Sequence, residues 1–271
     1  KILYVLLTGI SLGFSFFTNY LISNNTTPET YGLYGLYLWA TGLIAGASIF
    51  GLPALVRHDI NTENGTSRIS VAIVISTMLL FSITGTNEFW LSWSDVEIPS
   101  SIDWLLFIAV GSLAIYLSNL LSSFLQVENK FQTIGLLTLL RSLLMVSAIY
   151  YATSYGYINY SLLKIGILFS GSVFVIICAF LSYRHFKIYK LSFSFDSNNK
   201  ISKSTLLFCS PVALHGLVSF LALSIDRALI AGTSNAYLFG IYVLVFQYSQ
   251  IYTMIGDIGV KFYQNWIYKY A

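Results

Sequence analysis

The sequence predicts an all-α integral membrane protein with about eight transmembrane helices. Only 9% of the 271 residues are charged and 56% are hydrophobic, whereas an ordinary soluble domain carries about 25% charged residues. The hydrophobic residues are concentrated in stretches of roughly 20 residues, which is the length of a helix that crosses a bilayer. Too little polar surface remains for a water-soluble globule, so the composition excludes a soluble enzyme and a nucleic-acid-binding protein.

Eight stretches have the required length. In chain order they cover residues 2–22, 32–56, 69–84, 104–125, 131–152, 161–182, 205–230 and 237–258. We expect each to be a helix, because only a helix satisfies its own backbone hydrogen bonds away from water. Strands of a membrane barrel would alternate apolar and polar residues, and runs such as Val-Ala-Ile-Val-Ile at 71–75 do not.

The segments between the spans are polar or charged, and their charges are sorted by side. With an even number of spans, eleven of the fourteen lysines and arginines lie on the side of the N-terminus: Lys1, Arg57, Arg68, Lys130, Arg184, Lys187, Lys190, Lys200, Lys203, Lys261 and Lys269. The opposite loops contain acidic residues and no lysine or arginine. Because basic loops stay in the cytoplasm, we expect the N-terminus there.

Two short passages predict an internal repeat. Tyr-Gly-Leu-Tyr at 31–34 opens the second span, and Phe-Gly-Ile-Tyr at 239–242 opens the eighth, 208 positions later. A parallel repeat of six helices is a common build of transporters. We therefore expect an N-terminal six-helix lobe over 1–183, a basic cytoplasmic linker over 184–204, and the first two helices of a similar second lobe over 205–271. On this hypothesis the chain is C-terminally truncated from a protein of about twelve spans.

The most informative residues are three cations inside spans. Arg141 lies near the middle of the fifth span, where a charge costs about 2.5–3.5 kcal/mol on insertion scales. It is either a cavity cation for an anionic substrate such as a phosphate, which we favour, or an arginine tied to helix carbonyls or a carboxylate. Lys164, near the start of the sixth span, either lines the cavity or extends to the headgroups. Arg227 is the third cation.

Three further titratable residues are candidates for ion coupling. Asp226 precedes Arg227, and neighbouring residues on a helix project roughly 100° apart, so the two side chains need not pair with each other. We expect them to pair with neighbouring helices, with contact to the substrate as the alternative. Asp257, near the end of the eighth span, either carries a coupling ion or is solvated. His215 follows Pro211 by one turn, and it either senses protons or is a hydrogen-bonded histidine of the bundle.

Catalytic and metal-binding patterns are missing from the sequence. It contains no Gly-x-Ser-x-Gly elbow, no His-Glu-x-x-His pair and no phosphate-binding glycine loop. Its two cysteines, Cys178 and Cys209, lie in apolar stretches and form no metal-ligand pattern. We therefore expect a protein that is not an enzyme and uses no cofactor and no metal.

Three passages carry a resemblance to a known family. Pro-Glu-Thr-Tyr-Gly-Leu-Tyr at 28–34, Asp-Arg-Ala-Leu-Ile-Ala-Gly at 226–232 and Gly-Ile-Tyr at 240–242 are similar to motifs of the polysaccharide flippases in the MATE-like exporter superfamily. That group includes exporters of O-antigen and capsule repeat units. The positions that match the motifs one by one are Pro28, Glu29, Tyr31, Gly32, Asp226, Arg227, Gly240 and Tyr242.

The resemblance implies two six-helix lobes around a cationic cavity that opens alternately to each face. It implies a multi-pass protein of a bacterial or archaeal plasma membrane, surrounded by membrane lipids. The implied cargo is an undecaprenyl-diphosphate-linked oligosaccharide, moved to the outer leaflet for lipopolysaccharide or capsule synthesis. It also implies coupling to H⁺ or Na⁺, and polysaccharide polymerase machinery as a partner.

Other classes remain as alternatives. A drug exporter or a peptidoglycan-precursor exporter belongs to the same superfamily, but a drug exporter of cationic cargo should carry a carboxylate at mid-membrane. A membrane polysaccharide polymerase should show a large basic outer loop, whereas the longest outer loop here, 85–103, is short and acidic. A structural scaffold has no need of three cations within its spans.

Overall fold

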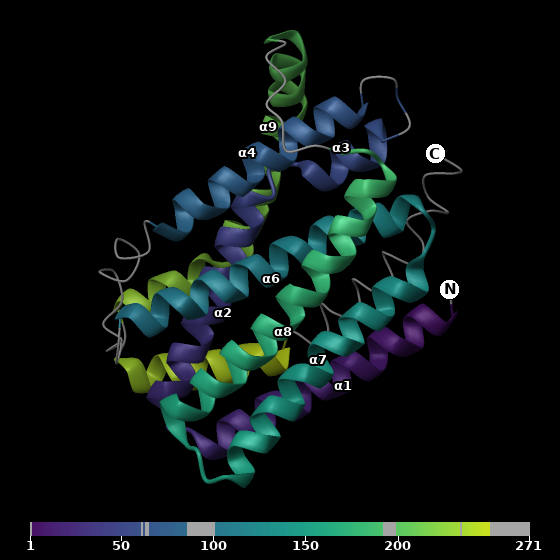
Figure 1. Cartoon of the computed structure of the whole chain (residues 1–271). Coiled ribbons are helices and arrows are strands. Elements are labelled where there is room, and N and C mark those ends of the chain that lie inside the picture. Colours follow the sequence, from purple (N-terminus) through teal and green to yellow (C-terminus); the bar gives the residue numbers. More distant parts are fainter. Residues whose placement is uncertain are drawn as a thin grey trace.

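The computed structural model describes residues 2–60, 62, 65–85, 101–191, 199–233 and 235–249. Within these residues all regular structure is helical (Figure 1). The helices are α1 (Ile2–Asn25), α2 (Pro28–Ser48), α3 (Leu52–Asp59), α4 (Gly65–Gly85), α6 (Ser101–Val127), α7 (Phe131–Ser154), α8 (Asn159–Ile188), α9 (Asn199–Thr233) and helix 236–249 (Ala236–Ser249). The predicted all-α fold is confirmed.

Seven segments are long and apolar enough to cross a membrane, so the protein is a multi-pass membrane protein. They are α1, α2 together with α3, α4, α6, α7, α8 and the part of α9 from Lys203 to Ala222. The predicted eighth span corresponds to helix 236–249, which is apolar but shorter in the described part of the chain. The rest of that span, with Asp257, lies outside the described residues.

The second span differs from its prediction because a turn divides it into α2 and α3. Phe50 and Gly51 both have positive φ, 46° and 66°, a backbone region that suits glycine and stops a right-handed helix. Pro53 then lies in the first turn of α3, where its missing N–H costs no hydrogen bond. The turn also lets α9 approach closely, since a Cβ on Gly51 would lie 2.9 Å from the carbonyl oxygen of Cys209.

Contacts made by side chains show which helix ends lie together. At one end, which we call the Asp103 end, the α1–α2 junction meets the start of α8, where the Thr27 amide donates to Asn159 Oδ1 at 3.0 Å. The starts of α6 and α8 are joined there by Asp103 and Lys164, whose charged atoms lie 2.9 Å apart. At the opposite end, which we call the Arg68 end, the starts of α1 and α7 meet through the rings of Tyr4 and Phe131.

Glu128 ties the turn between α6 and α7 to the end of α8, at the Arg68 end. Its carboxylate accepts a hydrogen bond from the Tyr189 hydroxyl at 3.0 Å and pairs with Lys130 at 2.7 Å and His185 at 3.1 Å. Burial raises the pKa of Glu128, but Lys130, Tyr189 and His185 outweigh burial and bring it below its usual value. Burial and the bond to Glu128 raise the pKa of Tyr189 to about 12.

The helices pack side by side around one interior. α1 lies on α7, α7 on α8, α8 on α6, and α6 on α2, while α9 covers α2 and α4 (Figure 1). Small residues allow the closest approaches: a Cβ on Gly171 of α8 would lie 2.6 Å from a methyl carbon of Val110 in α6. Helix 236–249 crosses α2 near the start of both helices, where a Cβ on Gly32 would lie 3.2 Å from the Gly240 nitrogen.

A buried ion pair joins α3, α4 and α9 at the Arg68 end. Asp59 is 1% exposed, and its carboxylate lies 2.5 Å from Arg68 Nη1 and 2.5 Å from His58 Nδ1. The His58 ring and the Arg68 guanidinium both approach the ring of Phe208 in α9, at 5.5 and 5.7 Å. The carboxylate therefore organises the contact through which α9 joins the first helices.

Asp59→Asn should destabilise this end of the bundle. Removing one partner of a buried ion pair leaves the other uncompensated, which costs about 3–5 kcal/mol, and we expect the lower part of that range because Arg68 keeps 20% of its side chain exposed. Thermal unfolding of the detergent-solubilised protein measures the loss. The double variant with Arg68→Gln should unfold at a higher temperature than Asp59→Asn alone, and an unchanged melting temperature in Asp59→Asn would contradict the structural role.

Candidate functional site

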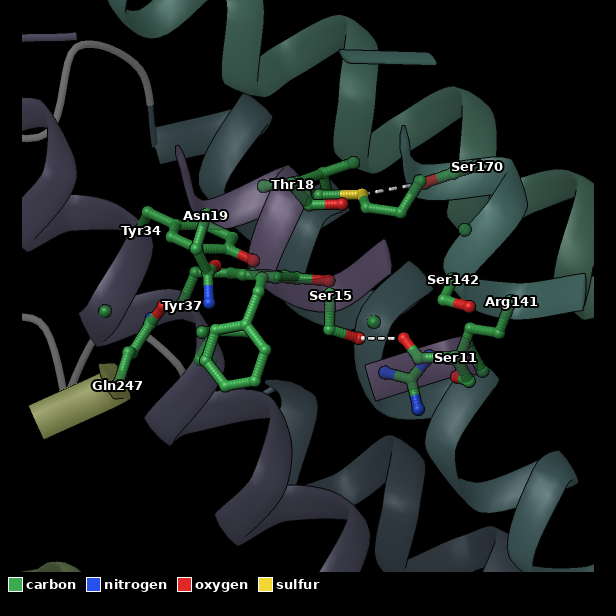
Figure 2. Close-up of a pocket in the computed structure, with 18 of the residues that line it drawn as sticks. Ser11, Ser15, Thr18, Asn19, Tyr34, Tyr37, Arg141, Ser142, Ser170 and Gln247 are labelled. Atoms are coloured by element: carbon green, nitrogen blue, oxygen red, sulfur yellow. Dashed lines mark hydrogen bonds between the residues drawn. The ribbon is translucent and has the colours of Figure 1, made fainter. Parts of the chain in front are cut away.

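A cavity of about 440 Å³ lies between the helices (Figure 2). Residues from α1, α2, α6, α7, α8, α9 and helix 236–249 line it. Its polar lining residues are Ser11, Ser15, Thr18, Asn19, Tyr34, Tyr37, Thr138, Arg141, Ser142, Ser170, Arg227 and Gln247. The lining contains two cations and no aspartate or glutamate among the described residues, so the walls favour an anionic or neutral polar ligand over a cation.

Arg141 projects into this cavity from α7. Its guanidinium lies 6.0 Å from the ring centroid of Phe174 on α8, and Figure 2 shows its side chain extending toward Ser11 of α1. No carboxylate of the described residues lies within ion-pairing distance of it, and the side chain is exposed. A cation inside an apolar bundle that lies beside open space and has no ion-pair partner among the described residues can accept an anionic ligand.

A polar stripe of α1 lines the same cavity as Arg141, with Ser11 nearest to it. Ser11, Ser15, Thr18 and Asn19 follow one another at helical spacing along one side of α1. The hydroxyls donate to carbonyls, Ser11 to Thr138 at 3.1 Å and Ser15 to Ser11 at 3.0 Å, so their lone pairs remain as acceptors for a ligand. Reasoning from single charged residues missed this stripe, although its spacing of three and four positions was visible in the sequence.

Arg227 and Asp226 both contact helix 236–249. The Arg227 guanidinium lies 3.9 Å from the ring centroid of Phe246 and lines the cavity. Asp226 accepts a hydrogen bond from the Tyr242 hydroxyl. Since Tyr242 and Phe246 are four positions apart, they share one face of that helix. The neighbouring charges of α9 therefore contact the same helix at successive turns, and Arg227 joins Arg141 as a cation of the cavity lining.

The remaining sequence-predicted residues lie elsewhere. Lys164 is 46% exposed at the Asp103 end, where it pairs with Asp103, and it does not line the cavity. His215 is exposed on α9 and does not line it either. Asp257 falls outside the described residues. In the part of the chain that the structure describes, no group of three or more His, Cys, Asp or Glu side chains is placed to hold a metal ion.

Because Lys164 pairs with Asp103 at a partly exposed helix end, Lys164→Gln should have little effect. Exposed ion pairs contribute about 0–1 kcal/mol, so the melting temperature of the purified protein should change by at most a few degrees. The amount of the variant in the membrane, measured by immunoblot, should stay near the wild-type amount. A large drop in melting temperature would instead show that this pair is needed to hold the starts of α6 and α8 together.

Comparison with known proteins identifies the chain's family. It matches the model of the family described as polysaccharide biosynthesis protein over residues 1–256, which include every described helix and all the residues that line the cavity. Searches of curated proteins and of solved structures found no match. The family match covers nearly the whole chain and agrees with the resemblance of its three motif passages, so the chain belongs to the polysaccharide biosynthesis protein family.

Proposed function

We propose that the protein is a flippase for a lipid-linked oligosaccharide, which it moves from the cytoplasmic to the outer leaflet of a bacterial or archaeal plasma membrane. The observation that carries the proposal is a polar cavity inside an apolar helical bundle, with Arg141 and Arg227 in its lining and no carboxylate among the described lining residues. Membership in a family of polysaccharide biosynthesis supports the same cargo class.

The chemistry of the cargo explains why such a cavity is needed. The undecaprenyl chain can stay among the lipid tails, while the diphosphate and the sugars must cross an apolar layer about 30 Å thick. Desolvating an unpaired phosphate is very costly, and the two guanidiniums offset that cost. The cations do not need to bind tightly, because tight binding would slow release on the far side.

Two other exporters of the superfamily differ from this proposal in their cargo. A drug exporter for cationic molecules would need a carboxylate in the cavity, and the described lining offers only arginines as charged groups. A peptidoglycan-precursor exporter carries the same lipid diphosphate with a different glycan. The family match to polysaccharide biosynthesis favours the polysaccharide repeat unit.

The proposal assigns ion coupling to one residue, Asp226. Asp226 lies beside Arg227 and is hydrogen-bonded to Tyr242, so a change in its protonation would alter the contact between α9 and helix 236–249. Asp226→Asn in reconstituted vesicles should make transport independent of an imposed pH gradient if a proton drives it. Repeating the transport measurement with an imposed sodium gradient tests whether Na⁺, rather than H⁺, is the coupling ion.

Deletion of the gene followed by reconstitution tests the proposed function. Deletion should abolish surface polysaccharide and cause undecaprenyl-diphosphate-linked intermediates to accumulate on the cytoplasmic side, as mass spectrometry of extracted lipids would show. The purified protein in vesicles should expose a fluorescent undecaprenyl-diphosphate oligosaccharide to a membrane-impermeant quencher. Lysis of the deletion strain with intact surface polysaccharide would indicate a peptidoglycan precursor, and no movement of the labelled lipid would contradict the proposal.

A further inference from the structure

We propose that the cavity holds a second subsite, centred on the neutral amides of Gln247 and Asn19, which binds the sugar unit attached to the diphosphate. This inference rests on the proposed function, and it adds a recognition element for the glycan to the cationic site at Arg141. It makes the protein selective for the sugar-bearing lipid over the bare lipid diphosphate.

Gln247 is 8% exposed and lines the cavity. Its Oε1 accepts a hydrogen bond from the Tyr31 hydroxyl at 2.9 Å, which fixes the orientation of the amide. The Nε2 of the same amide has no hydrogen-bond partner among the described residues. A buried donor without a partner is costly and uncommon, so this nitrogen is a candidate to donate to a ligand in the cavity.

The neighbours of Gln247 suit a sugar. Asn19 on α1 lines the same cavity and brings a second amide, which offers both donors and an acceptor. The rings of Phe16 and Tyr248 stack at 6.2 Å, which holds α1 alongside helix 236–249 close to both amides, since Phe16 lies three positions before Asn19 and Tyr248 directly follows Gln247. Tyr34 and Tyr37 stack at 6.3 Å in the cavity lining and add flat aromatic surface.

Arg141 and the two amides occupy different parts of the cavity, while the second cation, Arg227, stacks on Phe246, the residue before Gln247. In Figure 2, Asn19, Tyr34, Tyr37 and Gln247 lie on one side of the view, and Ser11, Ser142 and Arg141 lie on the other. A diphosphate is attracted to the guanidinium, since charge-assisted hydrogen bonds are stronger than neutral ones. Sugar hydroxyls and acetamido groups match the amides, and the apolar faces of sugar rings match the tyrosines. A polyprenyl tail would leave the Gln247 nitrogen unpaired.

A binding experiment with two lipids tests the subsite. Native mass spectrometry of the purified protein would measure the affinity for undecaprenyl diphosphate and for undecaprenyl diphosphate carrying N-acetylglucosamine. The wild type should prefer the sugar-bearing lipid by about five- to tenfold, as expected for one or two hydrogen bonds. Gln247→Leu and, independently, Asn19→Leu should lose most of this preference and keep the affinity for the bare lipid within about twofold.

Matched controls separate the subsite from general damage. Gln132→Leu and Asn119→Leu make the same changes at exposed positions of α7 and α6 that do not line the cavity, and both should keep the preference. An equal loss for both lipids in Gln247→Leu, a retained preference in both cavity variants, or no preference in the wild type would overturn the subsite. Failure of the wild type to bind either lipid would instead overturn the proposed function.

Discussion

Arg141→Ala should abolish transport of the lipid-linked oligosaccharide while leaving the protein inserted and folded. The side chain lines the cavity, has no ion-pair partner among the described residues and is exposed, so its removal breaks no salt bridge within the described part of the chain. What is lost is the charge that offsets desolvation of the diphosphate. We expect surface polysaccharide to fall at least tenfold in cells that carry the variant, with membrane levels of the protein unchanged on immunoblot.

Arg141→Lys separates charge from geometry. Lysine keeps the positive charge but loses the planar, bidentate donors of the guanidinium. Partial transport in this variant would mean that charge alone carries most of the effect, and complete loss would mean that the guanidinium shape is needed. Normal polysaccharide in Arg141→Ala would remove the residue from the binding site, and a variant that disappears from the membrane would show a role in folding.

Gly240→Ala should separate helix 236–249 from α2. A Cβ at this position would overlap the carbonyl oxygen of Pro28, which is backbone and cannot move as a flexible side chain does. Overpacking typically costs about 1–3 kcal/mol and occasionally more, and we expect the upper part of that range or beyond. Thermal unfolding in detergent should show a marked drop in melting temperature, together with loss of transport.

Gly46→Ala provides the control for this prediction. Gly46 also lies in a helix, yet a Cβ there would meet nothing within 4 Å. Alanine is the better helix former by about 1 kcal/mol, so this variant should be as stable as the wild type or slightly more stable. Equal melting temperatures for Gly240→Ala and Gly46→Ala would contradict the close crossing of the two helices.

Hydropathy and motif spacing predicted the helical fold and the family, because a bilayer restricts a chain to few solutions. The same reasoning predicted that Arg141 must face protein or water, and the cavity beside it agrees with that expectation. The turn at Phe50 and Gly51 was not predicted, because neither Gly51 nor Pro53 interrupts the apolar run enough to divide the predicted span. The positive φ angles of Phe50 and Gly51, which separate α2 from α3, are visible only in the structure.

The partners of the other candidate residues depend on tertiary contacts that a single sequence does not contain. Lys164 was equally compatible with the cavity and the headgroups until α6 placed Asp103 beside it. Gln247 drew no attention as one amide near the end of the chain, and its position became informative only when Tyr31, more than 200 positions away, was found to orient it. Buried charge can be located from sequence, whereas the neighbours that neutralise or orient it cannot.

The two passages that are alike in sequence, around Gly32 and Gly240, press against one another with almost no side chain between them. Because backbone lies against backbone there, no flexible side chain can adjust to a small change in spacing, and the two helices are either in contact or apart. Parting them would also break the hydrogen bond by which Tyr31 orients the Gln247 amide. The orientation of the amide that we propose to bind the glycan therefore depends on the contact between α2 and helix 236–249.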